Sequence, residues 1–474
     1  MIWAWILALL VSGCSYIPDY DLAQKSDPIC LDVSLFSVEN TLFEEGGWPT
    51  CNWWEMFEDE QLGDLILQGF TCSPTLQKAL EKLEQSCELA LQKRAKLFPE
   101  IDLNYQEQWQ HFSKNGFIRA LIPNERRVPS GDNQIDLTAN FSWEIDFFGK
   151  NKNLFAATLD LSCAQAAETA QAKMLLSVAI AQTYFDIQML IKQREILEKR
   201  VTIAQEVALL QLQREVVGVD LISNVWDAEQ NLHLLEEDLT TIDKDLTIAI
   251  HALNVLIGVG PDEELLEVKP TANFQSIFSL PCNLAIDLLA RRPDIVASGW
   301  RVEAAAKQIN AAKADFYPRV NLMAFAGLES LHFSNLFNWN SAMGGLEPAI
   351  YLPIFTAGRL KASLREKAAV FNAAVYDYNN LLLHAASEVA NQITSLTATK
   401  ENLCKQRRVV ELANKHYQLF QWRSEIGIDN ELTVLQQQDK LLIQAYQLAN
   451  LQQNHLLSVV NLIKALGGGY REYE

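Results

Sequence analysis

Two long tracts without proline constrain this 474-residue chain more than any other feature. Residues 150–216 and 357–425 contain no Pro and almost no Gly before the glycines at 218 and 427. A helix of that length extends for about 100 Å at 1.5 Å per residue. Helices of this kind cannot fold back into a single globule.

Each long tract is followed by a second helical tract with a seven-residue repeat. The first carries Leu232, Leu239, Leu246 and Leu253, with Leu235, Ile242, Ala249 and Leu256 at the second seam position, and the other carries Leu435, Leu442, Ala449, Leu456 and Ile463. This spacing is typical of coiled coils. We predict two antiparallel helix pairs, 150–216 with 220–258 and 357–425 with 429–466, each joined at a glycine that ends a helix. The heptads alone would favour a cytoplasmic coiled-coil scaffold.

Four sequence landmarks recur in one order, roughly 210 residues apart. They are Leu97-Phe98-Pro99 with Phe316-Tyr317-Pro318, Phe147 to Lys150 with Ile354 to Arg359, Arg214 to Asp220 with Arg423 to Asp429, and Leu256-Ile257-Gly258 with Ala465-Leu466-Gly467. We infer a tandem duplication. The first repeat is expected at 61–265 and the second at 266–474, with a seam near Pro261 to Pro281.

Alternating segments argue against the simple scaffold. Seven apolar residues (Ile135, Leu137, Ala139, Phe141, Trp143, Ile145, Phe147) alternate with six polar ones (Asp136, Thr138, Asn140, Ser142, Glu144, Asp146). Such a strand is long enough to cross a bilayer at a tilt. We predict strands at about 101–112, 134–147, 319–329 and 344–356. Glu107 interrupts the apolar series of the first, which places it at the periplasmic or headgroup edge unless a bulge shifts the register.

Four strands cannot close a barrel, and open strand edges are not tolerated in lipid. Strands must therefore come from several chains, eight in a dimer or twelve in a trimer. The segments 112–134 and 330–343 are the expected extracellular loops. The predicted fold class is mainly α, with long coiled-coil-like helices and a transmembrane β part.

The first 13 residues are apolar and end at Val11-Ser12-Gly13-Cys14, as in a bacterial lipoprotein signal. We predict a signal peptide at 1–13, lipidation of Cys14, and an anchor and linker at 14–60. A short buried helix with an incidental Cys is the alternative, and the usual basic residues are missing before the apolar stretch. Ser15 is not the aspartate that retains lipoproteins at the inner membrane, so we expect the outer membrane.

Seven further cysteines, with no CxxC spacing, argue against a disulfide framework and a zinc site. Pairs such as Cys30 with Cys51 or Cys72 with Cys87 remain open. The formal charge of −20 disfavours nucleic acid as a partner. Beyond the first 13 residues we expect no apolar run near the roughly 20 residues of a spanning helix. Catalytic motifs are missing from the sequence, so we expect no enzyme activity, cofactor or metal.

With these features, the chain resembles the TolC-like outer-membrane efflux proteins. Within that family it is most similar to the NodT-type lipoprotein branch, which serves resistance-nodulation-division (RND) pumps. The resemblance rests on Val11 to Cys14, Trp53-Trp54, Ala95 to Pro99, Trp143 to Gly149, Arg291 to Ile295, Ala311 to Pro318, Leu352 to Phe355 with Gly358-Arg359, Glu388-Val389 and Leu466 to Gly469. It implies a homotrimer with a 12-stranded barrel, continuous with a helical tunnel across the periplasm. The implied function is the exit duct for drugs or other small molecules, with a periplasmic adaptor, an inner-membrane RND pump and outer-membrane lipid as partners.

The resemblance also implies functional positions. The adaptor would dock at the two helix–turn–helix tips, formed by Arg214, Gly218, Val219 and Asp220 and by Arg423, Gly427, Ile428 and Asp429; plain helix capping is the alternative reading of these residues. The periplasmic aperture would involve Leu432, Gln436, Asp439 and Asp227. Gln436 stands where the family has an acidic residue, so we hypothesise that Leu432 and Asp439 constrict the tunnel.

Two other functions remain open: an exit channel for a type I secretion system, and a trimeric surface lipoprotein with no transport role. The Cys14 signal favours the pump branch. Asp136, Glu144 and Asp146, together with Gln106 and Gln108, lie on the polar strand face and predict a preference for cations.

Overall fold

The computed structural model describes residues 17–25, 48–111, 113, 131–261 and 291–471. The chain divides into two compact units. The sheet unit comprises 1–25, 84–164 and 299–377, and the helical unit comprises 26–83, 165–298 and 378–474. Each unit takes segments from both predicted repeats, so the repeats do not fold as separate bodies.

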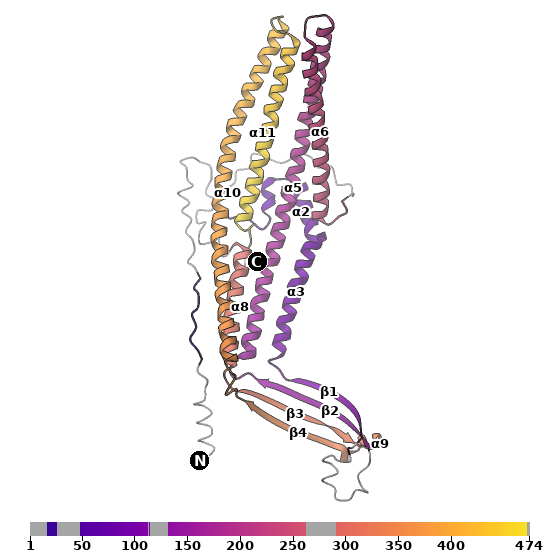
Figure 1. Ribbon diagram of the computed structural model, residues 1–474, viewed down its shortest axis with the longest axis vertical. Helices are drawn as coiled ribbons and strands as arrows, with labels where there is room; N and C mark the ends of the chain where they lie inside the picture. The colour runs from indigo at the N-terminus through magenta and orange to yellow at the C-terminus, as the bar shows by residue number, and fades with distance from the viewer. Residues whose placement is uncertain (1–16, 26–47, 112, 114–130, 262–290, 472–474) are drawn as a thin grey trace. The chain divides into compact units, whose positions relative to one another are not determined.

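The sheet unit contains four antiparallel strands in the order β1-β2-β3-β4 (Figure 1). They are β1 (Glu100–His111), β2 (Gly131–Ile145), β3 (Arg319–Ser330) and β4 (Ala342–Tyr351). The four expected strands are confirmed, but β4 was predicted to extend to 356. It ends at Tyr351. It tolerates Pro348 opposite Leu322, because an edge strand can leave one N–H position unpaired. A short helix α9 (Phe333–Leu336) and a 3-10 turn η4 (Trp339–Ser341) connect β3 to β4.

Four helices carry the chain to or from the strands: α3 (Pro74–Ala95), α5 (Lys150–Val216), α8 (Pro293–Ala314) and α10 (Arg359–Glu425). The helices α3 and α8 were not anticipated. Gly149 and Gly358 turn the chain from strand to helix with φ of 73° and 84°, a conformation that glycine adopts without strain. The Asp146 carboxylate accepts a 2.7 Å hydrogen bond from the Lys152 N–H and so caps the start of α5.

The helical unit contains the two predicted antiparallel pairs, α5 with α6 (Ile222–Ile257) and α10 with α11 (Glu431–Ala465). The heptad seam is confirmed for the first pair, because Leu235 and Ile242 pack on Leu197 and Val201 in one buried cluster. Its polar margin carries an ion pair of 2.6 Å between Arg194 Nε and Asp243 Oδ1.

The main core of the helical unit gathers α2 (Glu60–Cys72), the 3-10 turn η2 (Trp53–Phe57) and parts of α5, α6, α10 and α11. Trp53, Trp54 and Phe57 are almost fully buried there. The description of 14–60 as an anchor and linker is therefore wrong at its end. Asp59 caps α2 through the Leu62 N–H (3.2 Å) and accepts a 2.9 Å hydrogen bond from the Tyr184 hydroxyl.

The helix α5 also corrects the expectation that no apolar stretch could cross a membrane. An 18-residue window of this helix has a mean hydropathy of 1.4, so by length and composition alone the helix could cross a membrane. Half of that window, however, is buried inside the protein. Buried residues such as Ile180, Ala181 and Phe185 explain the apolar composition, because they form the main core of the helical unit.

Arg292 joins three helices at the C-terminal end of the core. Its buried guanidinium lies 2.7 Å from Asp294 Oδ2 and 2.9 Å from Glu388 Oε2, and donates to the Ala465 carbonyl at 3.0 Å. Removal of one partner from a buried ion pair leaves the other charge buried without compensation, which is strongly destabilising. Arg292 therefore fixes the start of α8 and the middle of α10 to the end of α11.

Gly467, Gly468 and Gly469 follow α11 with φ of 92°, 60° and 82°. A Cβ on Gly467 would overlap the Arg291 carbonyl, and one on Gly469 would overlap the Thr50 carbonyl. Only glycine permits both the left-handed backbone and this close approach. The glycine run therefore allows the backbone after α11 to pack directly against the backbone at Arg291 and at Thr50.

We predict that Gly467→Ala lowers the free energy of unfolding by about 3 kcal/mol, because backbone strain and steric overlap add. The loss of stability is measured as a lower unfolding temperature, by circular dichroism at 222 nm during heating. Gly260→Ala is the matched control, since nothing lies within 4 Å of its Cβ position. Equal unfolding temperatures for the two variants would contradict the prediction.

Candidate functional site

The strand register sorts the side chains of the sheet onto two faces. The pairs Leu103–Ala139, Leu137–Leu328 and Leu322–Pro348 lie directly opposite each other, and every second residue points to the same side. One face therefore carries Ile101, Leu103, Tyr105, Trp109, Ile135, Leu137, Phe141, Trp143, Val320, Leu322, Leu328, Leu346 and Ile350. Leu103 and Ile350 are each 75% exposed. The sheet thus presents a broad apolar surface that nothing in the described chain covers completely.

The opposite face is polar and acidic. Its charged residues within the strands are Glu100, Asp102, Asp132, Asp136, Glu144, Glu329, Glu347 and Arg319. Arg319 is the one basic residue among them, and its guanidinium donates to Asp315 at 2.6 Å. Asp146, expected on this face, lies beyond the end of β2 and caps α5 instead. The negative potential of the face is therefore largely unopposed.

Glu107 lies on the apolar face without disturbing the strands. The pairing of β1 with β2 is continuous from Glu100 to His111, so the expected alternative of a bulge is wrong. Its carboxylate accepts hydrogen bonds from the Tyr105 hydroxyl at 3.2 Å and from Asn133 Nδ2 at 2.6 Å. These two donors satisfy part of its hydrogen-bonding capacity near the loop end of β1.

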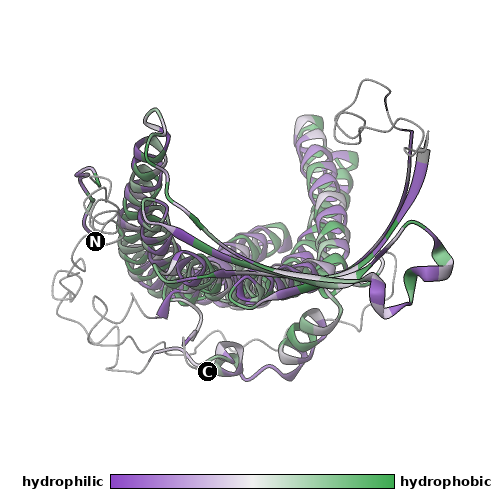
Figure 2. Ribbon diagram, turned by 90° about the horizontal axis from the view of Figure 1, so that it is seen from below, coloured by the Kyte–Doolittle hydropathy of each residue, from purple (hydrophilic) through white to green (hydrophobic). Residues whose placement is uncertain are grey.

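The edges of the sheet are open. β1 and β4 each have one neighbour among the described strands, and their other sides carry a row of backbone N–H and C=O groups. Figure 2 shows the strands following one curved surface. A curved sheet with one apolar face and two open edges is suited to closure with further copies of itself.

The two predicted tips have the same turn geometry. Gly218 and Gly427 both have φ of 78°. The N–H of Val219 donates to the Arg214 carbonyl, and the N–H of Ile428 donates to the Arg423 carbonyl, each at 2.9 Å. These bonds end α5 and α10 as in a Schellman motif. The predicted equivalence of the two turns is confirmed.

The charged tip residues pair within each turn. Arg214 Nε lies 3.1 Å from Asp220 Oδ2, and Arg423 Nε lies 2.7 Å from Asp429 Oδ2. The pKa of Asp220 is lowered first by the Leu221 backbone N–H and then by Asn224 and Arg214. The Arg and Asp side chains therefore have a clear capping role.

Of the apolar side chains exposed at these tips, the sequence analysis named Val219 and Ile428 and missed their neighbours. The neighbours are Val216, Val217, Leu221 and Trp226 at the first tip, and Trp422 and Ile426 at the second. Val219 is 66% exposed and Ile428 is 62% exposed. The signal was present as an apolar run across a turn, where polar residues are usual. Exposed apolar clusters of this kind often mark protein contacts.

The four aperture residues lie near the tips, on two helices. Leu432, Gln436 and Asp439 belong to α11, and Asp227 belongs to α6. No hydrogen bond or ion pair in the described ranges joins any two of the four. Asp439 instead pairs with Arg200 of α5 at 2.7 Å, a contact that ties the second helix pair to the first.

Cys14 lies outside the described residues, but the segment that follows it is placed. Ile17 and Tyr20 pack against the cluster of Phe316, Leu360 and Leu364 in the sheet unit. The Ala23 N–H donates to Asn372 Oδ1 at 2.7 Å. The described segment 17–25 therefore packs on the sheet unit beside Phe316, just before β3.

The remaining cysteines give no disulfide framework in the part that the structure covers. Cys72, Cys87 and Cys404 are free thiols, so Cys72 and Cys87 are not joined, and Cys30 and Cys282 lie outside the described residues. The described residues contain no group of three or more His, Cys, Asp or Glu side chains that could hold a metal ion.

An amphipathic four-stranded sheet joined to two long helix pairs is the architecture of outer-membrane channels. The chain belongs to the outer membrane efflux protein family, whose sequence profile matches residues 71–259 and 284–468. The two matches fall one in each predicted repeat.

Relatives with known names support this assignment. The multidrug resistance outer membrane protein MdtP of Escherichia coli K12 is 27% identical over 98% of this chain and 94% of its own length. The crystal structure of the outer membrane protein VceC of Vibrio cholerae is 30% identical, with a TM-score of 0.77 over 90% of this chain and all of that chain. The Campylobacter jejuni CmeC outer membrane channel has the same fold, with a TM-score of 0.84 over 97% of this chain and 96% of its own at 20% identity.

Proposed function

We propose that three copies of the chain form one 12-stranded barrel in the outer membrane, continuous with a helical tunnel in the periplasm. The observation that carries the proposal is the sheet with one apolar face and open edges at β1 and β4. Pairing of β4 with β1 of the next copy satisfies both edges, which lipid requires. The apolar face then contacts lipid, and the acidic face lines a water-filled conduit.

The duct serves a tripartite efflux system, as a non-enzymatic exit for drugs or other small molecules. A periplasmic adaptor and an inner-membrane RND pump are its partners. The support is the family membership together with relatives named multidrug resistance outer membrane proteins. Selection of cargo would belong to the pump, because a conduit lined by a general polar surface discriminates mainly by charge and size.

The acidic face predicts a cation-selective pore. Seven carboxylates against one paired guanidinium per sheet raise the local concentration of cations. Reversal potentials of purified protein in planar bilayers under a salt gradient measure the preference. We expect Asp102→Asn with Asp136→Asn to weaken it. An anion-selective pore, or no pore at all, would argue against the conduit.

The tips are the proposed adaptor-docking sites, through Val219 and Ile428 with their apolar neighbours. Arg214, Asp220, Arg423 and Asp429 shape the turns that present them. We expect Val219→Asp and Ile428→Asp to reduce co-purification with the periplasmic adaptor at least tenfold, because a charge in an apolar contact costs about 2 kcal/mol or more. Val219→Thr is the control for the first turn and Ile428→Val is the control for the second, since both new side chains are similar in shape to the original ones. Wild-type adaptor binding by Val219→Asp would disprove docking at the first tip.

The aperture is the second proposed site, with Leu432 and Asp439 narrowing the periplasmic entrance beside Gln436 and Asp227. Because Asp439 holds α11 to α5 through Arg200, we expect Asp439→Ala and Leu432→Ala to raise the single-channel conductance of the purified protein. Asp243→Ala removes a similar ion pair, but from Arg194 within the first helix pair, and should leave conductance unchanged. Wild-type conductance in both aperture variants would exclude these residues as the constriction.

Lipidation at Cys14 anchors the chain to the outer membrane in this proposal. Support comes from Ile17, three residues later, which packs beside Phe316 near the start of β3. We expect labelled palmitate to enter the wild-type protein and not Cys14→Ala; equal labelling of both would exclude this anchor.

A further inference from the structure

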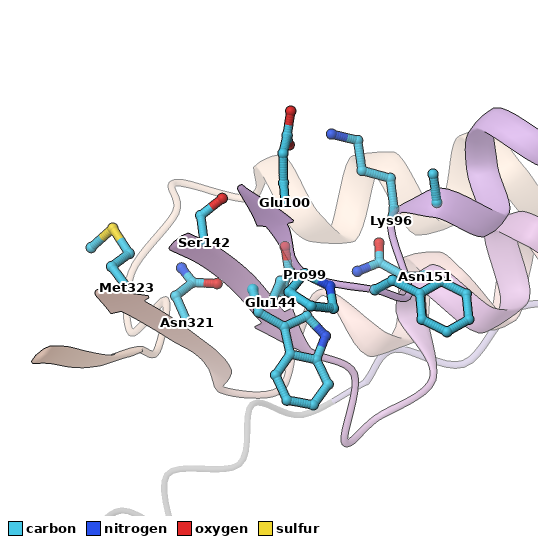
Figure 3. Close-up of a pocket in the computed structure, with 11 residues that line it drawn as sticks. Lys96, Pro99, Glu100, Ser142, Glu144, Asn151, Asn321 and Met323 are labelled. Carbon is cyan, nitrogen blue, oxygen red and sulfur yellow. The ribbon is translucent and has the colours of Figure 1, made fainter. Parts of the chain in front are cut away.

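A cavity of about 520 Å³ opens on the polar face of the sheet, where the strands meet the helices (Figure 3). It is lined by the first residue of β1, the end of β2, the start of β3, the loop after α3 and the first turn of α5. Glu100, Ser142, Glu144, Asn321 and Met323 all belong to the polar side of the strand register. Trp143, which belongs to the apolar side, also lines the cavity, so the cavity opens mainly but not wholly toward the proposed conduit.

The charged groups of the cavity do not balance. Glu100 and Glu144 contribute carboxylates and Lys96 contributes one ammonium group. No ion pair or hydrogen bond in the described chain engages either carboxylate side chain. Figure 3 shows Glu100 and Ser142 projecting from the same side of the sheet, with Lys96 across from Glu100. One negative charge therefore remains in excess, on groups that are free to accept a donor.

The rest of the lining is suited to an organic molecule rather than a bare ion. Phe98 is 58% exposed beside the cavity, and Met323 supplies a flexible thioether surface. The amides of Asn151 and Asn321 can donate or accept hydrogen bonds. The volume falls within the range of small-molecule pockets, which combine apolar walls with a few polar groups.

We propose that this cavity is a binding site for amphipathic organic cations in transit through the conduit. The ammonium group would lie between Glu100 and Glu144, and its apolar part would contact Phe98 and Met323. Aromatic faces favour quaternary ammonium ions, and the unpaired carboxylates reject anions. The proposal rests on the proposed function, because it requires that the polar face of the sheet line the conduit.

Isothermal titration calorimetry of the purified full-length protein with benzyltrimethylammonium tests the site. We expect saturable binding that weakens at least tenfold in Glu100→Gln with Glu144→Gln. Glu81→Gln with Glu84→Gln removes two exposed carboxylates of α3, outside the cavity lining and the strand faces, and should bind as the wild type does. Benzyl alcohol and benzenesulfonate, which are neutral and anionic, should not bind at the concentrations used.

Unchanged affinity in the double variant, or equal binding of the three probes, would overturn the proposal. Phe98→Leu gives a second variant that keeps all charges, and we expect it to weaken binding of the aromatic cation severalfold. Single-channel recording of the same preparations separates the two proposals. Conductance that persists without cation binding would refute the site alone, and binding without conductance would refute the conduit alone.

Discussion

The open edges of the four-stranded sheet are the constraint on which the rest of the structure depends. Each edge carries backbone groups that water can satisfy and that hydrocarbon cannot. The apolar face directs the sheet toward lipid, while the open edges prevent a single sheet from being stable there. Both demands are met at once when copies pair edge to edge. The duplication reduces the number of open edges, because each repeat supplies two strands and the two pairs join through β2 and β3.

The same duplication explains why the helix pairs end alike. Gly218 and Gly427 adopt one backbone conformation, and in both turns an arginine before the glycine pairs with an aspartate after it. Because the arginine and aspartate of each turn pair with each other, the apolar residues between them face solvent. Val219 and Ile428 are exposed for this reason.

Much of this architecture could be predicted from the sequence, because it depends on local periodicity. Helices α5 and α10 and strand β2 follow from uninterrupted patterns. Strand β4 was placed less accurately, since Gly344, Gly345 and Pro348 blur its alternation. The partners of Asp439 and Arg292 could not be predicted. Asp439 meets an arginine 239 positions away, and that contact depends on how α11 packs against α5.

Helix α5 contacts both α6 and α11 near the proposed aperture, and these contacts determine what an opening there would cost. Against α6, Leu197 and Val201 bury Leu235 and Ile242, and exposing such surface costs about 25 cal/mol per Å². Against α11, Arg200 pairs with Asp439, and water can replace a partly exposed ion pair at a net cost of about 1 kcal/mol. Apolar contacts hold α11 as well, because Met189 and Ile196 of α5 lie in one buried cluster with Ala449, against which Leu442 and Ala445 pack. Separation of α11 from α5 would therefore expose apolar surface in addition to breaking the ion pair, so loss of the Arg200–Asp439 pair alone leaves the two helices in contact.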